Sequence, residues 1–252
     1  MIACAEVSHD HDDTLPGKRN VVTASELARG VRVRDYVVRE KIAEGGFGAV
    51  YRVEHTVLGR QAALKVLHPE LASSREAIAR FEREARTVNV IKHPNVVDIY
   101  DFGELPDGRP YFVMELLVGI DLSEHLASFG PLSPEETLAL LTPLAAALSA
   151  AHAKGVVHRD VKPSNVFLAD GEPRRVVLLD FGVAKLLAPG TEGLTTSRHR
   201  IGTPSFMSPE QLAGGDIDGR ADVYALGALA YQMLTGQLPF GEGTPAVLLK
   251  AA

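Results

Sequence analysis

The feature of this sequence that most constrains its fold is a change of hydrophobic pattern near Val118-Gly119. Before this point, short apolar runs are separated by turns that contain glycine or proline, which is typical of β-strands. After it, apolar residues recur at spacings of three and four, which is typical of helices packed on a core. The sequence therefore predicts an α+β chain in two parts, with the boundary near residue 118.

The first part predicts strands around a single helix. Ile78, Phe81, Ala85 and Val88 lie on one face of that helix, and His93-Pro94 ends it. We expect strands over 36–42, 49–53, 62–67, 96–100 and 111–117. Residues 1–33 are interpreted as a poorly ordered, solvated acidic tail.

The second part predicts helices and one short buried strand. Ser133 can cap a helix, Pro134 suits its first position, and Glu136 completes a capping box. The apolar face of this helix is expected to contain Leu138, Leu141, Ala145, Leu148 and His152. A strand is expected over 176–179, and a last helix is indicated by Val223, Leu226, Ala230 and Met233.

Composition narrows the functional classes. The chain has 252 residues, 46% hydrophobic and 23% charged, so it can bury a core. Its net charge of −6 argues against a protein that coats duplex nucleic acid, and we expect no nucleic-acid partner. Apolar runs are too short for a membrane segment. The single cysteine, Cys4, and the lack of a signal-peptide pattern favour a cytoplasmic location.

Two motifs in the first part admit a phosphate-binding interpretation. The segment 43–50 (Ala-Glu-Gly-Gly-Phe-Gly-Ala-Val) joins two expected strands, and its glycines let backbone N–H groups approach a phosphate. By itself it is also compatible with an ordinary glycine-rich hairpin. Lys65 follows apolar strand residues and could be a surface lysine. If Glu84 on the expected helix pairs with it, the ammonium is held where it meets nucleotide phosphates.

The most specific signal lies in the second part. Segment 158–165 (His-Arg-Asp-Val-Lys-Pro-Ser-Asn) precedes the short expected strand, and Asp180-Phe181-Gly182 follows it. The two loops can therefore lie side by side. Asn165 and Asp180 offer the oxygen ligands that Mg²⁺ prefers beside a triphosphate. Asp160 is left to accept a proton from an attacking hydroxyl.

Further along, segment 202–210 follows a polar stretch that contains Thr195, Thr196 and Ser197, and a surface loop is the plain interpretation of both. Asp222 stands at the head of the last helix, where a helix cap is the plain interpretation.

Together these motifs resemble those of eukaryotic-type (Hanks-type) Ser/Thr protein kinases, and most closely the bacterial members, over roughly residues 36–240. The resemblance implies a two-lobed α+β fold. Residues 34–118 would form a small antiparallel sheet with one helix, and residues 119–252 a mainly helical lobe. It also implies MgATP as cofactor and protein Ser/Thr hydroxyls as substrates, with trans-autophosphorylation as one case.

The resemblance also implies residue roles. Asp160 would be the catalytic base, Lys162 would steady the transferred group, and Lys65 would bind phosphate while paired with Glu84. Asn165 and Asp180 would hold Mg²⁺. The ATP site would be formed by Ala43, Gly45, Gly46, Phe47, Gly48, Val50, Ala63, Met114, Glu115, Leu117 and Phe167. In this set the resemblance makes Val50, Ala63 and Phe167 walls of the adenine slot and puts Met114 at the gatekeeper position. The backbone of Glu115 and Leu117 would form hydrogen bonds with adenine.

Regulation is expected through the loop before segment 202–210. Arg159 and Lys185 resemble residues that bind a phosphate on that loop, and Thr195, Thr196 or Ser197 would carry it. Lys162 and Thr203 are similar to the pattern of Ser/Thr kinases rather than Tyr kinases.

The chain departs from the family pattern at three places. Ala43 stands where the first glycine is usual, and Ser208 stands where alanine is usual. The chain also ends at Ala252, whereas the family continues through further helices, one region of which supplies an arginine partner for the residue matching Glu210. Two functions are therefore expected in competition: an active Ser/Thr kinase, and a kinase-like nucleotide- or partner-binding module with little or no catalytic activity.

Overall fold

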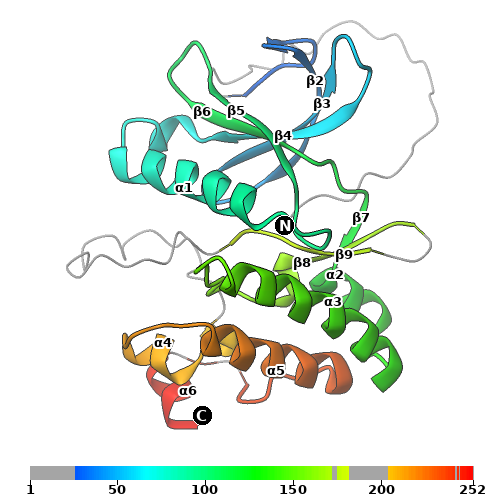
Figure 1. The fold of residues 1–252 in the computed structure, drawn as a ribbon, viewed down its shortest axis with the longest axis vertical. Helices are drawn as coiled ribbons and strands as arrows, with labels where there is room; N and C mark the ends of the chain where they lie inside the picture. The colour runs from blue at the N-terminus through cyan, green and yellow to red at the C-terminus, as the bar shows by residue number, and fades with distance from the viewer. Residues whose placement is uncertain (1–25, 172–174, 182–203, 242, 244, 252) are drawn as a thin grey trace, which may run out of the picture.

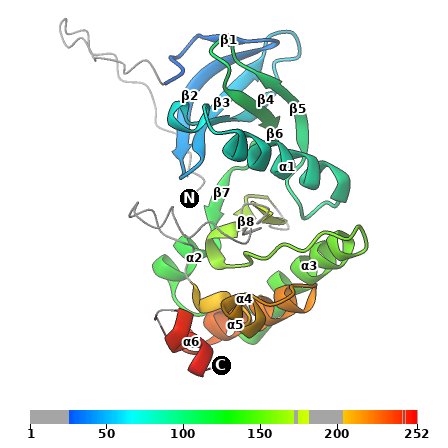
Figure 2. The same ribbon diagram turned by 90° about the vertical axis from the view of Figure 1, so that its left-hand side faces the viewer.

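The computed structural model describes residues 26–171, 175–181, 204–241, 243 and 245–251. Figure 1 shows two lobes, one above the other, joined by the stretch that runs from β6 to β7. The upper one, called here the N-terminal lobe, holds a sheet and one long helix. The lower one, the C-terminal lobe, is mainly helical, and the view in Figure 2 shows the same division.

The sheet of the N-terminal lobe has six strands in the order β1-β2-β3-β4-β6-β5, and every neighbouring pair is antiparallel. Its strands are β1 (Arg32–Val33), β2 (Tyr36–Glu44), β3 (Gly48–His55), β4 (Gln61–Leu67), β5 (Ile99–Glu104) and β6 (Pro110–Met114). A short 3-10 turn, η1 (Pro69–Leu71), follows β4. The predicted antiparallel sheet is therefore confirmed.

The helix of this lobe, α1 (Arg75–Ile91), begins at a side-chain cap, because the Ser74 hydroxyl accepts a hydrogen bond from the Ala77 N–H. Its buried face carries Ala77, Phe81, Ala85, Val88 and Ile91, which includes three of the four residues predicted from periodicity. Phe81 packs on Phe112 of β6 with ring centroids 4.9 Å apart. This contact holds α1 against the sheet and thereby fixes the position of Glu84 relative to the sheet.

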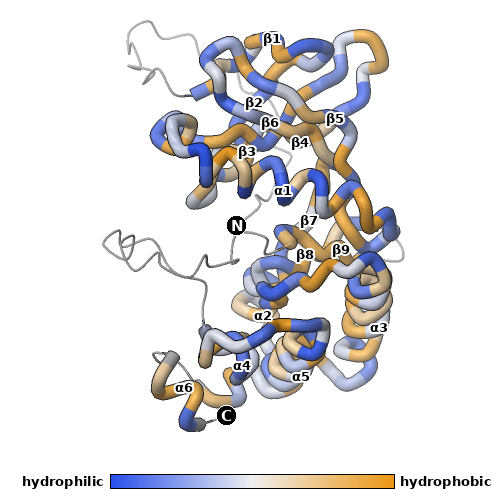
Figure 3. The backbone as a smooth tube through the Cα atoms, turned by 60° about the vertical axis from the view of Figure 1, so that its left-hand side comes forward, coloured by the Kyte–Doolittle hydropathy of each residue, from blue (hydrophilic) through white to orange (hydrophobic). Residues whose placement is uncertain are grey.

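The C-terminal lobe contains a second, three-stranded antiparallel sheet in the order β7-β8-β9. Its strands are β7 (Gly119–Asp121), β8 (Val166–Ala169) and β9 (Arg175–Leu178), and β8 and β9 are mostly hydrophobic in Figure 3. The helices are α2 (Leu122–Phe129), α3 (Pro134–His152), η2 (Pro163–Asn165), η4 (Pro204–Phe206), α4 (Pro209–Ala213), α5 (Arg220–Thr235) and α6 (Pro245–Ala251).

The predicted start of α3 is correct, and its predicted face is not. Ser133 and Glu136 form a complete capping box. Leu138, however, is 65% exposed, and the buried residues are Thr137, Leu144, Ala147, Leu148 and Ala151. The helix is rotated relative to the prediction because it packs on both α5 and β9. These two contacts decide which residues are buried, and a single apolar stripe in the sequence does not predict them.

Several predicted boundaries also need correction. β5 begins at Ile99 rather than at residue 96, and β6 ends at Met114 rather than at residue 117. Residues 26–33, which the sequence pattern places in the tail, reach the sheet: β1 pairs with β2, and the Leu27 N–H donates to the Tyr51 hydroxyl. Residues 1–25 lie outside the described part. Among the helices that the structure describes, none combines the length and apolarity that crossing a bilayer requires.

The core runs through both lobes. One cluster of buried side chains includes Val50 and Phe81 above, and Phe167 and Leu229 below. A second, smaller cluster contains Val38, Tyr51, Leu64 and Val113 and covers the other face of the upper sheet. Because the first cluster crosses the junction, packing in either lobe positions residues of the other.

We predict that Gly119→Ala destabilises the fold by about 2–3 kcal/mol. Gly119 has φ 139°, and a Cβ there would lie 2.2 Å from the backbone oxygen of Leu168. Gly227→Ala is the matched control, because Gly227 lies within α5 with nothing within 4 Å of an added Cβ. That change should stabilise by about 0.5–1 kcal/mol. Urea unfolding measures both, and equal shifts of the two variants would contradict the prediction.

Candidate active site

Three charged side chains meet where the lobes face each other. The Lys65 Nζ on β4 lies 2.6 Å from the Glu84 Oε1 on α1 and 3.2 Å from the Asp180 Oδ1, just beyond β9. The side chains of Lys65 and Glu84 are 14% and 19% exposed, whereas that of Asp180 is 50% exposed. The structure thus brings together the Lys65–Glu84 pair and adds Asp180 from the other lobe.

The pKa values of the Glu84 and Asp180 carboxyl groups shift in opposite directions. Burial raises the pKa of the Glu84 carboxyl, although the Lys65 ammonium opposes this, and the nearby Asp180 charge adds to the rise. The Lys65 ammonium holds the pKa of the Asp180 carboxyl below its usual range. Burial alone would lower the pKa of Lys65, but the Asp180 and Glu84 carboxylates outweigh it and raise that pKa. Lys65 is therefore a fixed cation.

The second group of side chains lies on the loop before β8. Lys162 Nζ donates to the Asp160 Oδ2 at 2.9 Å. The Asn165 Nδ2 donates to the Asp160 backbone oxygen at 2.8 Å and to its Oδ2 at 3.1 Å. These bonds fix the Asp160 carboxylate, and they leave the Asn165 amide oxygen as an acceptor for a cation.

The backbone of this loop is held by Asp222, which the sequence offers only as a helix cap, and by Gln211, which no sequence motif indicates. The Asp222 carboxylate accepts hydrogen bonds from the N–H groups of His158 and Arg159, both at 2.8 Å. Gln211 Nε2 donates to the Arg159 oxygen at 2.9 Å. Arg159 has φ 66°, so these bonds hold a strained conformation.

The helix-cap interpretation of Asp222 is therefore wrong. The N-cap of α5 is Gly219, and Asp222 lies in the first turn with only 1% of its surface exposed. Its Oδ2 also lies 2.7 Å from the His152 Nε2 of α3. The available sequence signal was an acidic residue among the apolar positions of a helix, which requires a buried partner.

His158 connects the two loops. It is fully buried, its Nε2 lies 2.9 Å from the Leu179 oxygen, and its Nδ1 accepts from the Asp160 N–H at 3.2 Å. Both contacts fit a neutral ring with the proton on Nε2. Its ring packs on Phe181 at 4.6 Å between centroids. Burial lowers the pKa of His158, which keeps the ring neutral.

The glycine loop between β2 and β3 closes as a hairpin. The Gly45 N–H donates to the Gly48 oxygen at 2.9 Å, and the His68 Nε2 lies 2.8 Å from the Gly45 oxygen. A Cβ at Gly48 would lie 2.1 Å from the Val66 oxygen, so this glycine is required by the close approach of β4. Gly46 has nothing within 4 Å of an added Cβ, and Phe47 is 37% exposed.

The predicted walls of the adenine site come from both lobes. Ala63 of β4 and Met114 of β6 are cross-strand partners, and Val50 of β3 lies opposite Lys65. The predicted wall residues Val50, Ala63 and Phe167 belong to one buried cluster together with Met114 and Leu117, and Ala43 packs against it. The structure thus brings these residues together beside the charged groups.

The polar groups fit a nucleotide with a divalent cation. In the described part of the chain, no set of three or more His, Cys, Asp or Glu side chains is arranged to hold a metal ion. The half-exposed Asp180 carboxylate and the Asn165 amide oxygen would therefore supply only part of a coordination shell. Such a partial oxygen set is typical of Mg²⁺ sites completed by phosphates and water.

Other predicted residues lie apart or outside the described part. Lys185, Thr195, Thr196, Ser197 and Thr203 fall outside the described residues. Glu210, in α4, is partly buried, and none of the described residues forms an ion pair with it.

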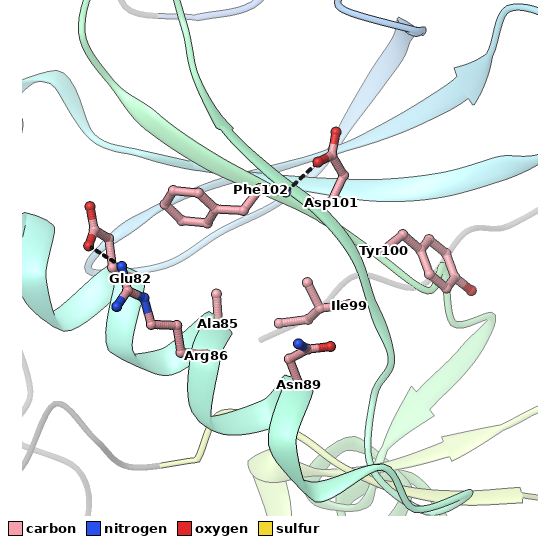
Figure 4. Close-up of a pocket in the computed structure, with 8 residues that line it drawn as sticks. All are labelled: Glu82, Ala85, Arg86, Asn89, Ile99, Tyr100, Asp101 and Phe102. Carbon is pink, nitrogen blue, oxygen red and sulfur yellow. Dashed lines mark hydrogen bonds and ion pairs between the residues drawn. The ribbon is translucent and has the colours of Figure 1, made fainter.

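A separate groove of about 260 Å³ lies between α1 and β5 (Figure 4). Ala85, Ile99 and Phe102 form its apolar side, and the Glu82–Arg86 pair lies along α1. None of the site residues predicted from the sequence lines this groove, so it is distinct from the candidate active site.

We predict that acid destabilises this chain through His158. Because its folded pKa lies below the ordinary 6.5, the stabilisation is complete above pH 6.5 and is lost as the pH falls below it. The unfolding free energy should fall by up to about 1.4 kcal/mol per pH unit from this group. Urea unfolding at several pH values should show a flatter profile for His158→Gln. Equal slopes, or an NMR titration that finds the pKa of His158 in the folded chain at or above the ordinary 6.5, would contradict the prediction.

Known proteins resemble this chain in sequence and in fold. The chain matches the protein kinase domain family over residues 36–250. It is 45% identical over 232 residues to the serine/threonine-protein kinase Pkn1 of Myxococcus xanthus, across 91% of this chain and 33% of that protein. It is 39% identical over 227 residues to the serine/threonine-protein kinase PknF of Mycobacterium tuberculosis, across 88% of this chain and 47% of that protein.

A solved structure agrees with the sequence relatives. The crystal structure of the Mycobacterium tuberculosis PknI kinase domain superposes with a TM-score of 0.66 and 36% identity, over 85% of this chain and 79% of that one. The chain spans about a third of Pkn1 and about half of PknF. The two-lobed α+β fold and the resemblance drawn from the motifs are confirmed, and this chain belongs to the protein kinase domain family.

Proposed function

We propose that this chain is a Ser/Thr protein kinase, which transfers the γ-phosphoryl group of ATP to Ser and Thr hydroxyls of proteins. The observation that carries the proposal is the meeting of Lys65 and Glu84 from one lobe with Asp180 from the other, beside the loop on which Lys162 and Asn165 fix Asp160. The names of the relatives support the Ser/Thr class.

Individual side chains of this chain have separate roles in the proposed reaction. Lys65, fixed by Glu84, offers its ammonium to phosphate oxygens. Asp160 is oriented by Lys162 and Asn165 and accepts the proton of the attacking hydroxyl. Lys162 then lies beside the developing negative charge and stabilises it.

Asn165 and Asp180 would hold Mg²⁺, which neutralises phosphate charge when it is bound. Asp180 is the exposed member of the Lys65 cluster, so it can turn part of its carboxylate toward a cation while Lys65 stays paired with Glu84. The Ala43–Val50 hairpin would cover the phosphates, and the backbone of Glu115 and Leu117 would bond adenine.

The remaining expectations complete the proposal. We place the chain in the cytoplasm, where ATP is available, with proteins as substrates and further copies of itself among them. Arg159 would bind a phosphate carried by Thr195, Thr196 or Ser197 and thereby order the loop before α4.

The test of phosphoryl transfer is a substitution that removes the charge of the base and keeps its size. Asp160→Asn should lower transfer of labelled phosphate from ATP with Mg²⁺ by about 10²–10⁴-fold, because no group remains to accept the hydroxyl proton. Its affinity for nucleotide should change little. Asp170→Asn is the control, since Asp170 is exposed on the neighbouring turn. Nucleotide binding without transfer by the wild type would contradict the proposal and favour a binding module.

A second prediction concerns autophosphorylation. Peptide mass spectrometry of the wild-type chain after incubation with MgATP should find phosphate on Thr195, Thr196 or Ser197, and the Asp160→Asn chain should remain unmodified there. Arg159→Gln should reduce the gain in activity that this modification produces, because the loop phosphate then loses a charge-assisted partner. Unmodified peptides from an active wild type would rule this out.

A further inference from the structure

An ion pair crosses from the connection between the lobes to β9. Glu115 directly follows β6, and its Oε1 accepts a hydrogen bond from the Arg175 Nη2 at 2.6 Å. Arg175 is the first residue of β9, the strand that leads to Asp180. The pair therefore links the segment expected to bind adenine with the strand that positions a metal-binding carboxylate.

The surroundings make this pair a mechanical link between the lobes. The Glu115 N–H donates to the Asp98 oxygen at 2.9 Å. Asn95, on the segment between α1 and β5, bonds β9 twice: its oxygen accepts from the Leu178 N–H at 2.8 Å, and its Nδ2 donates to the Val176 oxygen at 2.7 Å. The junction is thus hydrogen-bonded to β9 near Asn95, and Arg175 adds the contact to the connection itself.

Apolar packing does not fill the space beside this contact. A cavity of about 350 Å³ lies here, lined by Glu115, Arg175, the end of α1 and the segment before β5. Lys92 and Asp98, which also line it, pair with each other at 2.8 Å. Glu115 and Arg175 are therefore each other's charge partners, and at this position the ion pair bridges a gap between the lobes.

We propose that Arg175 is a positioning residue, which holds the lobes through Glu115 at the separation where Lys65 reaches Asp180 and thereby raises the affinity for ATP. The proposal rests on the proposed kinase function. Lys65 and Asp180 lie in different lobes, with Nζ and Oδ1 3.2 Å apart, so a change in the separation of the lobes changes this distance directly. The Arg175 and Glu115 side chains are 39% and 24% exposed, so the effect is modest and sensitive to salt.

The test compares two matched arginine variants. Arg175→Gln should raise both the KM for ATP and the Kd of a fluorescent ATP analogue about two- to fivefold, the size expected for a partly exposed ion pair. The kcat at saturating ATP should stay within about twofold. Arg39→Gln is the control, because Arg39 and Glu54 form a pair at 3.0 Å with exposures of 42% and 34% inside the upper sheet. It should leave both constants unchanged.

Charge exchange separates the pair from a merely structural arginine. Glu115→Arg combined with Arg175→Glu should restore the KM toward the wild-type value, whereas Arg175→Glu alone should not. In high salt the difference between wild type and Arg175→Gln should shrink, because the pair is screened.

Several results would overturn the proposal. These are an unchanged Kd and KM in Arg175→Gln, an equal rise in Arg39→Gln, no rescue by the exchanged pair, or a change in kcat at constant KM. A wild type that binds the nucleotide without transferring phosphate contradicts the proposed function alone, and the Kd comparison still decides the role of Arg175. A wild type that does not bind nucleotide contradicts both.

Discussion

The structure depends on one ammonium group shared by two carboxylates. Lys65 lies 2.6 Å from Glu84 and 3.2 Å from Asp180, and these three residues come from β4, from α1 and from the end of β9. A largely buried charge is tolerated only when it is paired, so α1 must lie against the sheet and β9 must end beneath it. The continuous apolar core supplies this placement. Asp180 is the more exposed carboxylate, and it is therefore the one that can exchange its partner for a cation.

The same principle organises the loop that carries Asp160. Its backbone is held by a buried carboxylate, Asp222, and by the amide of Gln211, which together fix the strained conformation of Arg159. His158 adds a neutral ring between this loop and the end of β9. The backbone that carries the proposed base is thus held by Asp222, Gln211 and His158, which have no direct role in the proposed reaction.

Features that short sequence patterns encode were predicted correctly, and features that depend on contacts between separate elements were not. The capping box of α3 was predicted because it involves residues three positions apart, yet the buried face of α3 was wrong because α5 and β9 decide it. β6 was expected to continue to residue 117, since apolar residues follow Met114, but those residues form the connection between the lobes. Asp222 was interpreted as a cap because its partners, His158 and Arg159, lie far away in the sequence.

The sequence by itself determined the α+β class, the order of the motifs and the identity of the charged groups, because each is encoded within a short segment or a fixed spacing. Only the tertiary structure decided that Lys65 pairs with Asp180 as well as Glu84, that Asp222 and Gln211 hold the loop of Asp160, and that Arg175 reaches Glu115. These contacts join residues from separate elements, and no local spacing encodes them. They form because the packing of two lobes on one core brings their charges within hydrogen-bonding distance.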